Sequence, residues 1–415
     1  MLAALALAPA ASAWTTLATG VQNIVVPSMI VTEAGTELVS WESPVAGTIS
    51  ISRNRASAKT LVSGDPIAGR TQLVQQPTGA IQLYFPNGQG VARMTSTDDG
   101  QTWTGPLQTQ SHTVGGVMAA AVAPDGTPYF AQDGTGFVNV FRGLNGETVK
   151  NVFPRCCGYA ESLAVDTAGL VQIAFYSNAD PDGTFLYERL AADLSVAGST
   201  ALKPTAPHND RVPLVADRAG NTFTAWPPGY PEATTLTVVP FRGGAPAGDG
   251  VAFRGPFTGG EPHAALAVDT QDRVWAVWTG AGAVHVARSR THGQHFGAIV
   301  SAPVPAGTAY QVSAAALPGE PGAADVIVNL GSSLVEQQLK PGLSVLVSKK
   351  TKVVGKKKVV SRWAQALDDG FGVPTATFRI GGRTIHADAQ GKARVPPGSG
   401  KAAAPGYTGA AFHVR

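Results

Sequence analysis

The sequence predicts an all-β protein, a seven-bladed β-propeller followed by a small β-sandwich. Only 14% of its 415 residues are charged, while Gly (49) and Pro (30) are abundant, a composition that suits many short strands joined by tight turns. An apolar hairpin recurs at intervals of roughly 43 to 52 residues, the length of a four-stranded propeller blade. The pattern and the charge both change near residue 340, which predicts a second domain.

Each copy of the repeat is an apolar strand, a tight turn at Gly or Asp, and a second apolar strand that often ends in an aromatic residue. Seven copies predict seven blades, with a six-bladed ring as the alternative. The copies are Ser28–Trp41, Leu73–Phe85, Ala119–Phe130, Leu163–Tyr176, Pro213–Trp226, Ala265–Trp278 and Val312–Asn329.

The most specific motif runs from Ser96 to Trp103 and reads S-x-D-x-G-x-T-W. Asp98 can accept hydrogen bonds from backbone N–H groups of its own turn, and Gly100 permits the positive φ at which the chain reverses. Trp103 is expected to pack under the hairpin. The motif resembles the Asp-box, or BNR repeat, of the sialidase-like β-propeller superfamily, where it is a structural turn away from the usual active site.

Worn copies of the box occur elsewhere. Residues 289–296 keep the Ser, the Gly and an aromatic residue but have Thr291 where the Asp belongs. Residues 14–17 resemble the end of another box with the outer strand that follows it. We therefore expect the N-terminal strand to complete the last blade, whose other three strands lie near residues 312–339. Such closure removes the exposed edge of an open ring.

The N-terminus has the features of a cleaved leader. Residues 2–8 are apolar, and Ala11-Ser12-Ala13 has the small-x-small form of a signal-peptidase site. We expect residues 1–13 to be a signal peptide, Trp14 to be the mature N-terminus, and the protein to be secreted or extracytoplasmic. An ordinary disordered terminus is the alternative. No later stretch is long and apolar enough to form a transmembrane helix.

The predicted domains are the propeller, residues 14–339, and a basic domain, residues 340–415. From Glu336 onward the chain has 14 Lys and Arg against 4 Asp and Glu, whereas the residues before it have 17 against 24. The sequence pattern over most of residues 342–415, including ADAQGKA at 387–393, resembles that of a bacterial immunoglobulin-like or carboxypeptidase-regulatory-like β-sandwich. Its lysine clusters indicate either a solvated strand face or contact with an anionic cell-surface polymer. They lack interleaved aromatic residues, so no nucleic-acid partner is expected.

The resemblance to sialidases implies an arginine near the start of the propeller that holds the substrate carboxylate. Here Pro27, Gly35 and Thr36 match the family pattern, but the arginine position is Val25. The resemblance also implies a nucleophilic tyrosine in the last blade, for which Tyr310 is the candidate. It needs a glutamate partner, and Glu161 is the best positional match. Without the arginine, release of sialic acid is not expected.

Polar and titratable residues gather just before the first strand of several repeats. In a propeller these segments point to the same end of the ring, which favours a binding site there, although lead-in loops are also polar because they are exposed. The three histidines among them lack the short spacing of a zinc site, so no metal or cofactor is expected. The candidate ligand-binding residues are Arg155, Tyr159, Glu161, His208, Asp210, Arg211, Glu261, His263 and Tyr310.

Cys156 and Cys157 are adjacent and are the only cysteines. In an oxidising compartment they can form a vicinal disulfide, although neighbouring Cα atoms lie closer than in ordinary disulfides. A similar pair occurs in some exported Asp-box propellers. Such a bond would give a rigid apolar surface for a ligand ring; two buried thiols or a loop staple are the alternatives.

These observations predict an exported, non-catalytic binding module for a glycan or cell-surface ligand. One alternative is a sialidase-like glycoside hydrolase or a lyase that uses Glu161, Asp210 or His263. Another is a scaffold that binds a protein. The enzyme needs two titratable groups within about 5 to 10 Å of each other, whereas the binding module needs only aromatic rings and hydrogen-bond donors. The sequence does not indicate the oligomeric state.

Overall fold

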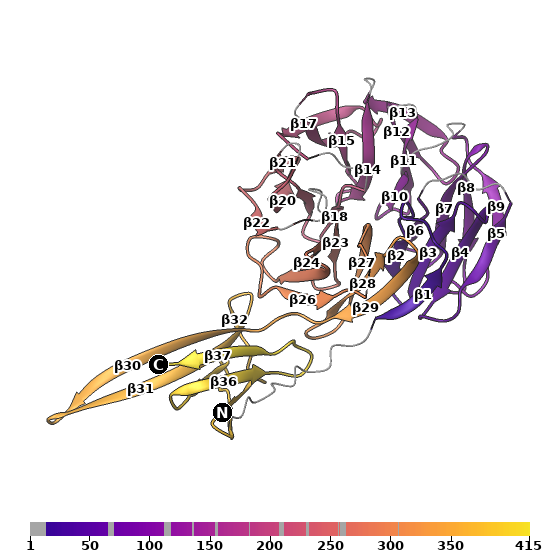
Figure 1. Ribbon diagram of the computed structural model, residues 1–415. Coiled ribbons are helices and arrows are strands. Elements are labelled where there is room, and N and C mark those ends of the chain that lie inside the picture. Colours follow the sequence, from indigo (N-terminus) through magenta and orange to yellow (C-terminus); the bar gives the residue numbers. More distant parts are fainter. Residues whose placement is uncertain are drawn as a thin grey trace.

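The computed structural model describes residues 14–64, 70–111, 118–134, 137–153, 157–181, 183–206, 211–229, 232–255, 257, 263–305 and 307–415. In this part the chain consists of β-strands joined by turns. None of it forms a helix that is long and apolar enough to cross a membrane. The all-β prediction is confirmed. Figure 1 shows a large group of sheets, from β1 to β29, and a smaller elongated part, from β30 to β37.

The large part contains seven antiparallel sheets within the described residues, and each sheet follows the previous one along the chain. The predicted hairpin repeats supply the first two strands of each sheet. The sheets comprise β2 (Ser28–Val31), β3 (Glu37–Ser43), β4 (Thr48–Arg53) and β5 (Lys59–Ser63); β6 (Gln72–Gln75), β7 (Ile81–Asn87), β8 (Gly90–Ser96) and β9 (Thr104–Gln108); β10 (Met118–Val122), β11 (Pro128–Gly134), β12 (Phe137–Arg142) and β13 (Thr148–Phe153); β14 (Gly158–Val165), β15 (Val171–Ser177), β16 (Thr184–Leu190) and β17 (Val196–Leu202); β18 (Leu214–Ala216), β19 (Asn221–Trp226), β20 (Thr235–Arg242), β21 (Ala245–Pro246) and β22 (Val251–Arg254); β23 (Ala264–Val268), β24 (Val274–Gly280), β25 (Ala283–Ser289) and β26 (Val300–Pro303); and β27 (Gln311–Leu317), β28 (Ala323–Asn329), β29 (Ser333–Leu339) and β1 (Thr15–Thr19).

The first strands of these sheets contact one another in a ring. Each contacts the first strand of the next sheet, and β27 of the last sheet contacts β2 of the first. Seven hydrophobic clusters lie between successive sheets, and one of them joins the last sheet to the first. Sheets packed face to face around a common axis define a β-propeller, so the prediction of a β-propeller is confirmed.

The N-terminal strand pairs with the last sheet, as the sequence predicts. β1 lies antiparallel to β29, with Thr15 opposite Glu336. The indole Nε1 of Trp14 donates a hydrogen bond to the carbonyl oxygen of Pro303 at 2.7 Å. Strands from the two ends of the propeller segment therefore share one sheet, and the ring is fastened by backbone hydrogen bonds.

The Asp-box forms the turn between β8 and β9. Asp98 Oδ1 accepts from the backbone N of Thr102 at 2.9 Å, and Asp98 Oδ2 accepts from the Thr102 hydroxyl at 2.6 Å. The Ser96 hydroxyl accepts from the Gly100 N–H at 2.9 Å. Trp103 packs against the hydrophobic cluster between the first two sheets, and its Nε1 donates to the Gly100 carbonyl at 3.1 Å. The predicted structural roles of these residues are confirmed.

Substitution of Gly100 tests this turn. Its φ is +82°, and a Cβ placed there would lie 2.6 Å from Leu38 of the first sheet. Gly100→Ala adds left-handed strain to a steric clash, so we expect a loss of about 2–3 kcal/mol of unfolding free energy in urea titrations. Gly79→Ala is the control, because its φ is +85° but a Cβ there would meet no atom within 4 Å. Equal losses in the two variants would show that the contact with Leu38 is unimportant.

The worn box at 289–296 takes a carboxylate from another part of the chain. The Thr291 hydroxyl accepts from the backbone N of His295 at 3.0 Å, as Asp98 does in the complete box. Asp369 Oδ2, from the turn after β31 (Lys357–Asp368), accepts from the backbone N of Arg290 at 2.6 Å and from the Thr291 hydroxyl at 3.3 Å. Asp369 thus supplies the charge that the box lacks, and it attaches the C-terminal part to the sixth sheet.

The C-terminal part contains two further sheets that share one hydrophobic cluster, which includes Ala366, Phe378 and Phe412. A long hairpin extends from the first of them (Figure 1). The sheets comprise β30 (Ser344–Val354), β31, β32 (Phe371–Gly372) and β35 (Lys392–Arg394), and β34 (Arg383–His386), β33 (Thr377–Ile380), β36 (Gly398–Ala403) and β37 (Ala410–Val414).

Candidate functional site: the axial cavity

A cavity of about 360 Å³ lies on the axis of the ring, and all seven first strands contribute to its wall. Its size is in the range of small-ligand pockets. Most of the wall consists of alanine and other apolar side chains, because the first strands carry few bulky polar residues. Among the described residues of the wall, Arg211 is the only charged one. The polar residues that line it are Ser28, Gln72, Ser162, Gln311 and Ser313.

Arg211 is placed by the segment that leads into β18. Its Nη2 donates to the carbonyl oxygen of Met118 at 3.2 Å, while its Nε has no hydrogen-bond partner among the described residues. Burial lowers the pKa of Arg211 to about 9; repulsion from Arg70 adds to the shift and attraction to Glu161 opposes it. The side chain remains charged at neutral pH, and an anion in the cavity would relieve both its desolvation and the repulsion.

A β-bulge in β14 positions Glu161. The pairing with β15 shifts between Tyr159 and Ser162, and Ala160 has a φ of +61°, which is strained for a residue with a Cβ. The Ala160 carbonyl accepts a hydrogen bond from the backbone N of Val212 at 2.8 Å. The bulge therefore ties the fourth sheet to the lead-in of the fifth, and it places the buried Glu161 within electrostatic range of Arg211.

The predicted aromatic residues occupy separate positions. The Tyr159 ring stacks on Tyr176 with centroids 6.4 Å apart. Tyr310 is half-buried, and its ring lies against Gly331, where a Cβ would come within 2.7 Å of it. No hydrogen bond joins the Tyr310 hydroxyl to Glu161, so the structure does not bring these two described residues together as a nucleophile and its partner. Their catalytic roles stay predictions.

Other predicted residues are placed only in part. His263 is half-buried just before β23, and its carbonyl accepts from the backbone N of Thr279 at 3.0 Å. The Cys157 carbonyl accepts from the backbone N of Asn178 at 3.3 Å. Because Cys156 lies outside the described residues, the vicinal disulfide stays a prediction. The other predicted site residues outside the described part are Arg155, His208, Asp210 and Glu261.

Val25 stands in the core between the last and first sheets, 1% exposed. Its carbonyl accepts from the Asn329 side chain at 2.7 Å. An apolar, buried side chain there cannot hold a carboxylate, which is consistent with the expected loss of the sialidase arginine.

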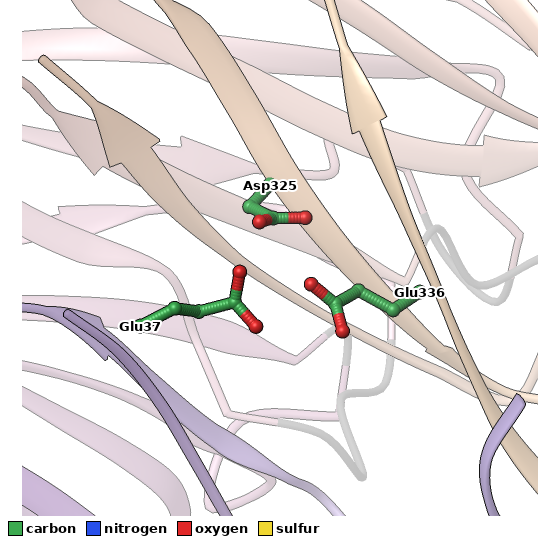
Figure 2. Close-up of side chains that lie close together, drawn as sticks. All are labelled: Glu37, Asp325 and Glu336. Atoms are coloured by element: carbon green, nitrogen blue, oxygen red, sulfur yellow. The ribbon is translucent and has the colours of Figure 1, made fainter. Parts of the chain in front are cut away.

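A second cluster of titratable residues joins the last sheet to the first. Figure 2 shows the carboxylates of Glu37 in β3, Asp325 in β28 and Glu336 in β29 pointing toward one another, and their oxygens lie within 4.8 Å of one another. Arg55, after β4, donates to Asp325 at 2.6 Å and to Glu336 at 2.8 Å and lies 3.4 Å from Glu37. One arginine therefore balances three buried carboxyl groups.

These carboxyl groups cannot all be ionised at neutral pH. Burial, followed by the interaction with Asp325, raises the pKa of Glu37 to about 10. Burial and repulsion by Asp325 raise the pKa of Glu336 to about 7. Attraction to Asp325 raises the pKa of Arg55, although burial opposes this shift. Glu37 is consequently neutral in the folded protein at pH 7, and the positive charge of Arg55 interacts with the other two carboxyl groups, Asp325 and Glu336.

No local pattern in the sequence indicated this cluster or the presence of Arg70 near Arg211. Asp325 lies in a strongly apolar strand, AADVIVN, and Glu336 lies in the neighbouring strand, SLVEQQL. A carboxylate in such a strand signals a buried partner. The identity of that partner, about 280 positions away in the chain, could not be read from local pattern.

Comparisons with known proteins support the fold. No protein-family model matches this sequence, and no curated protein matches it. A catalytically inactive virginiamycin B lyase from Staphylococcus aureus, solved with quinupristin, is similar over 79% of this chain and 98% of its own, with 12% identity and a TM-score of 0.52. A streptogramin B lyase is similar over 78% and 96%, with 14% identity and a TM-score of 0.50. At this identity the likeness shows the fold alone: the chain is a β-propeller protein.

Proposed function

We propose that residues 14–339 form a seven-bladed, sialidase-like β-propeller in which each of the seven sheets is one blade. The ring of first strands, the seven inter-sheet clusters and the Asp-box support this count and relationship. Residues 340–415 form an immunoglobulin-like or carboxypeptidase-regulatory-like β-sandwich. The two sheets that enclose one hydrophobic core support this assignment. The first 13 residues are a signal peptide and the mature protein is extracytoplasmic. The apolar residues 2–8 and the small-x-small sequence Ala11-Ser12-Ala13 support this part of the proposal.

The propeller is a binding module for a glycan or another cell-surface ligand that presents an anionic group to the axial cavity. The observation that carries this proposal is the incompletely paired guanidinium of Arg211 in a wall whose other described residues are uncharged. A charge-assisted hydrogen bond to a carboxylate or phosphate would satisfy its Nε. Apolar walls and a few fixed polar groups are typical of small-molecule sites.

A glycoside hydrolase or lyase is the second candidate. The observation in its favour is the strained bulge at Ala160 beside the buried Glu161, because strained backbone is frequent at catalytic sites. Glu161 would then be one of the two titratable groups that such chemistry requires. The two functions make different predictions, since an enzyme releases product whereas a binding module returns its ligand intact.

The proposal can be tested with arrayed acidic and neutral glycans. We expect the wild-type protein to retain acidic glycans, and Arg211→Met to weaken the best of them at least about tenfold in calorimetric titrations, because a charge-assisted contact contributes about 1.5–3 kcal/mol. Arg254→Met, at an exposed position of β22, is the control and should bind like wild type. Retention of acidic glycans that is unchanged by Arg211→Met would refute the assigned site. Turnover of the bound glycan would favour the enzyme.

A further inference from the structure

The hairpin of β30 and β31, here called the basic arm, extends away from the rest of the molecule (Figure 1). Its two strands pair from Ser344 opposite Leu367 out to Val354 opposite Lys357. The inner rows are held by β35, which pairs with residues 363–365 of β31. The Arg362 carbonyl, opposite Lys349, accepts a hydrogen bond from the backbone N of Val395 at 3.0 Å. In the rows from Lys350 to the tip, the two strands pair only with each other.

The outer half of the arm is strongly and uniformly basic. No Asp or Glu occurs between residues 344 and 367, and none of its lysines forms an ion pair with a described residue. All six lysines are exposed, and Arg362 is half-buried. The seven cations are Lys349, Lys350, Lys352, Lys356, Lys357, Lys358 and Arg362.

These positive charges do not stabilise the pairing of the two strands of the arm. Lys349 lies directly opposite Arg362, and like charges in opposed positions destabilise a strand pair. A two-stranded ribbon is marginally stable even without such repulsion. Lysines can protect a strand edge from aggregation, but here they occupy both strands, both faces and the tip of the arm. Arg362 Nε donates to an oxygen of Arg415 at 2.9 Å, but the six exposed lysines form no ion pair with a described residue, and this excess of positive charge indicates an anionic partner.

We propose that the basic arm binds an acidic polysaccharide that lies along it. Side chains two residues apart on one strand face are about 6.8 Å apart. Lys350, Lys352 and Lys357 occupy three consecutive rows of one face, because Lys357 pairs with Val354. This face therefore presents a cation about every 6–7 Å to a linear polymer with one anionic group per sugar. Val359, 42% exposed on the same face, offers an apolar contact for a sugar ring.

A flat anionic membrane fits this distribution less well. The cations begin at row 349, six residues before the turn at Gly355, which places the innermost ones about 20 Å from the tip. A membrane touched by the tip would leave Lys349 and Arg362 beyond the screening length of about 8–10 Å. Single-stranded nucleic acid fits poorly because its bases stack on aromatic rings. The one aromatic residue of the arm, Trp363, lies at its inner end, with Lys392 Nζ 5.3 Å from the ring centroid.

The test is binding of the full-length protein to polygalacturonate at low and high salt. We expect Lys350→Glu/Lys352→Glu/Lys357→Glu to weaken binding at least tenfold and to flatten its salt dependence. The matched control reverses three exposed cations on the second C-terminal sheet, Arg379, Arg383 and Lys401, and should change affinity less than twofold. Thermal unfolding of both triple variants confirms that they are folded.

Two results would overturn the proposal. Equal weakening by the two triple variants would show that net charge, rather than the arm, binds the polymer. Binding to phosphatidylglycerol vesicles or to duplex DNA, without binding to polygalacturonate, would assign the arm to another partner. The arm shares no residue with the axial cavity, so this inference stands or falls independently of the function proposed for the cavity.

Discussion

Arg288→Met is expected to lower the free energy of unfolding by about 3–5 kcal/mol, because it leaves a buried carboxylate without its partner. Arg288 and Asp368 form an ion pair in which each side chain is 1% exposed. The Tyr407 hydroxyl donates to the same carboxylate at 3.0 Å. The guanidinium carbon of Arg288 also lies 5.3 Å from the ring centroid of Trp275. This group joins the sixth sheet of the propeller to the C-terminal part.

Urea titrations of the wild type and four variants measure the effect. Asp368→Asn should also be strongly destabilising, whereas the double variant Arg288→Met/Asp368→Asn should lose less than the sum, because neither charge remains. Arg290→Met is the matched control: Arg290 lies 3.5 Å from the same carboxylate but is 32% exposed, so its loss should be below about 1 kcal/mol. A change of less than 1 kcal/mol in Arg288→Met would contradict the assigned role of the buried pair.

The sequence predicted the parts of this fold that depend on local pattern. The hairpins are set by apolar alternation and by turn residues a few positions apart. β2 and the start of β3 fall in the first predicted repeat, Ser28–Trp41, and β3 continues to Ser43. Closure of the ring was also predictable, because residues 14–17 resemble the end of a box, which marks them as a final outer strand.

Side-chain contacts between other distant segments could not be predicted. Thr291 was recognised as a departure from the box, but the Asp369 that compensates for it comes from 78 residues later. Arg211 was predicted as a ligand-binding residue because it lies just before the first strand of a repeat. Its position in the wall of the axial cavity and its proximity to Arg70, however, depend on how the seven sheets are arranged in the ring. Local sequence determines where each strand and turn forms, whereas the geometry of the ring determines which of them come into contact.

Glu37→Gln is expected to make the protein more stable than wild type above pH 7. The pKa of Glu37 is about 10 in the folded protein, raised mainly by burial, against about 4.5 in the unfolded chain. Between these values the folded state holds a proton that the unfolded chain releases, so the stability contributed by this group is greatest at acidic pH and is lost as pH rises. Each bound proton gives a slope of about 1.4 kcal/mol per pH unit. The amide mimics the neutral acid and removes the slope.

The measurement is the unfolding free energy in urea from pH 5 to pH 9. Glu336 and Glu188, whose pKa values burial raises to about 7, give slopes of the same sign below pH 7 in both proteins. The difference between wild type and Glu37→Gln above pH 7 therefore isolates Glu37. We expect near-equality at pH 5 and an advantage of about 5 kcal/mol for the variant at pH 9, because a slope of about 1.4 kcal/mol per unit acts over four pH units. Glu33→Gln, in the exposed turn before β3, should follow wild type at every pH. Parallel curves for wild type and Glu37→Gln would mean that Glu37 ionises normally and that the junction of the first and last sheets does not respond to pH.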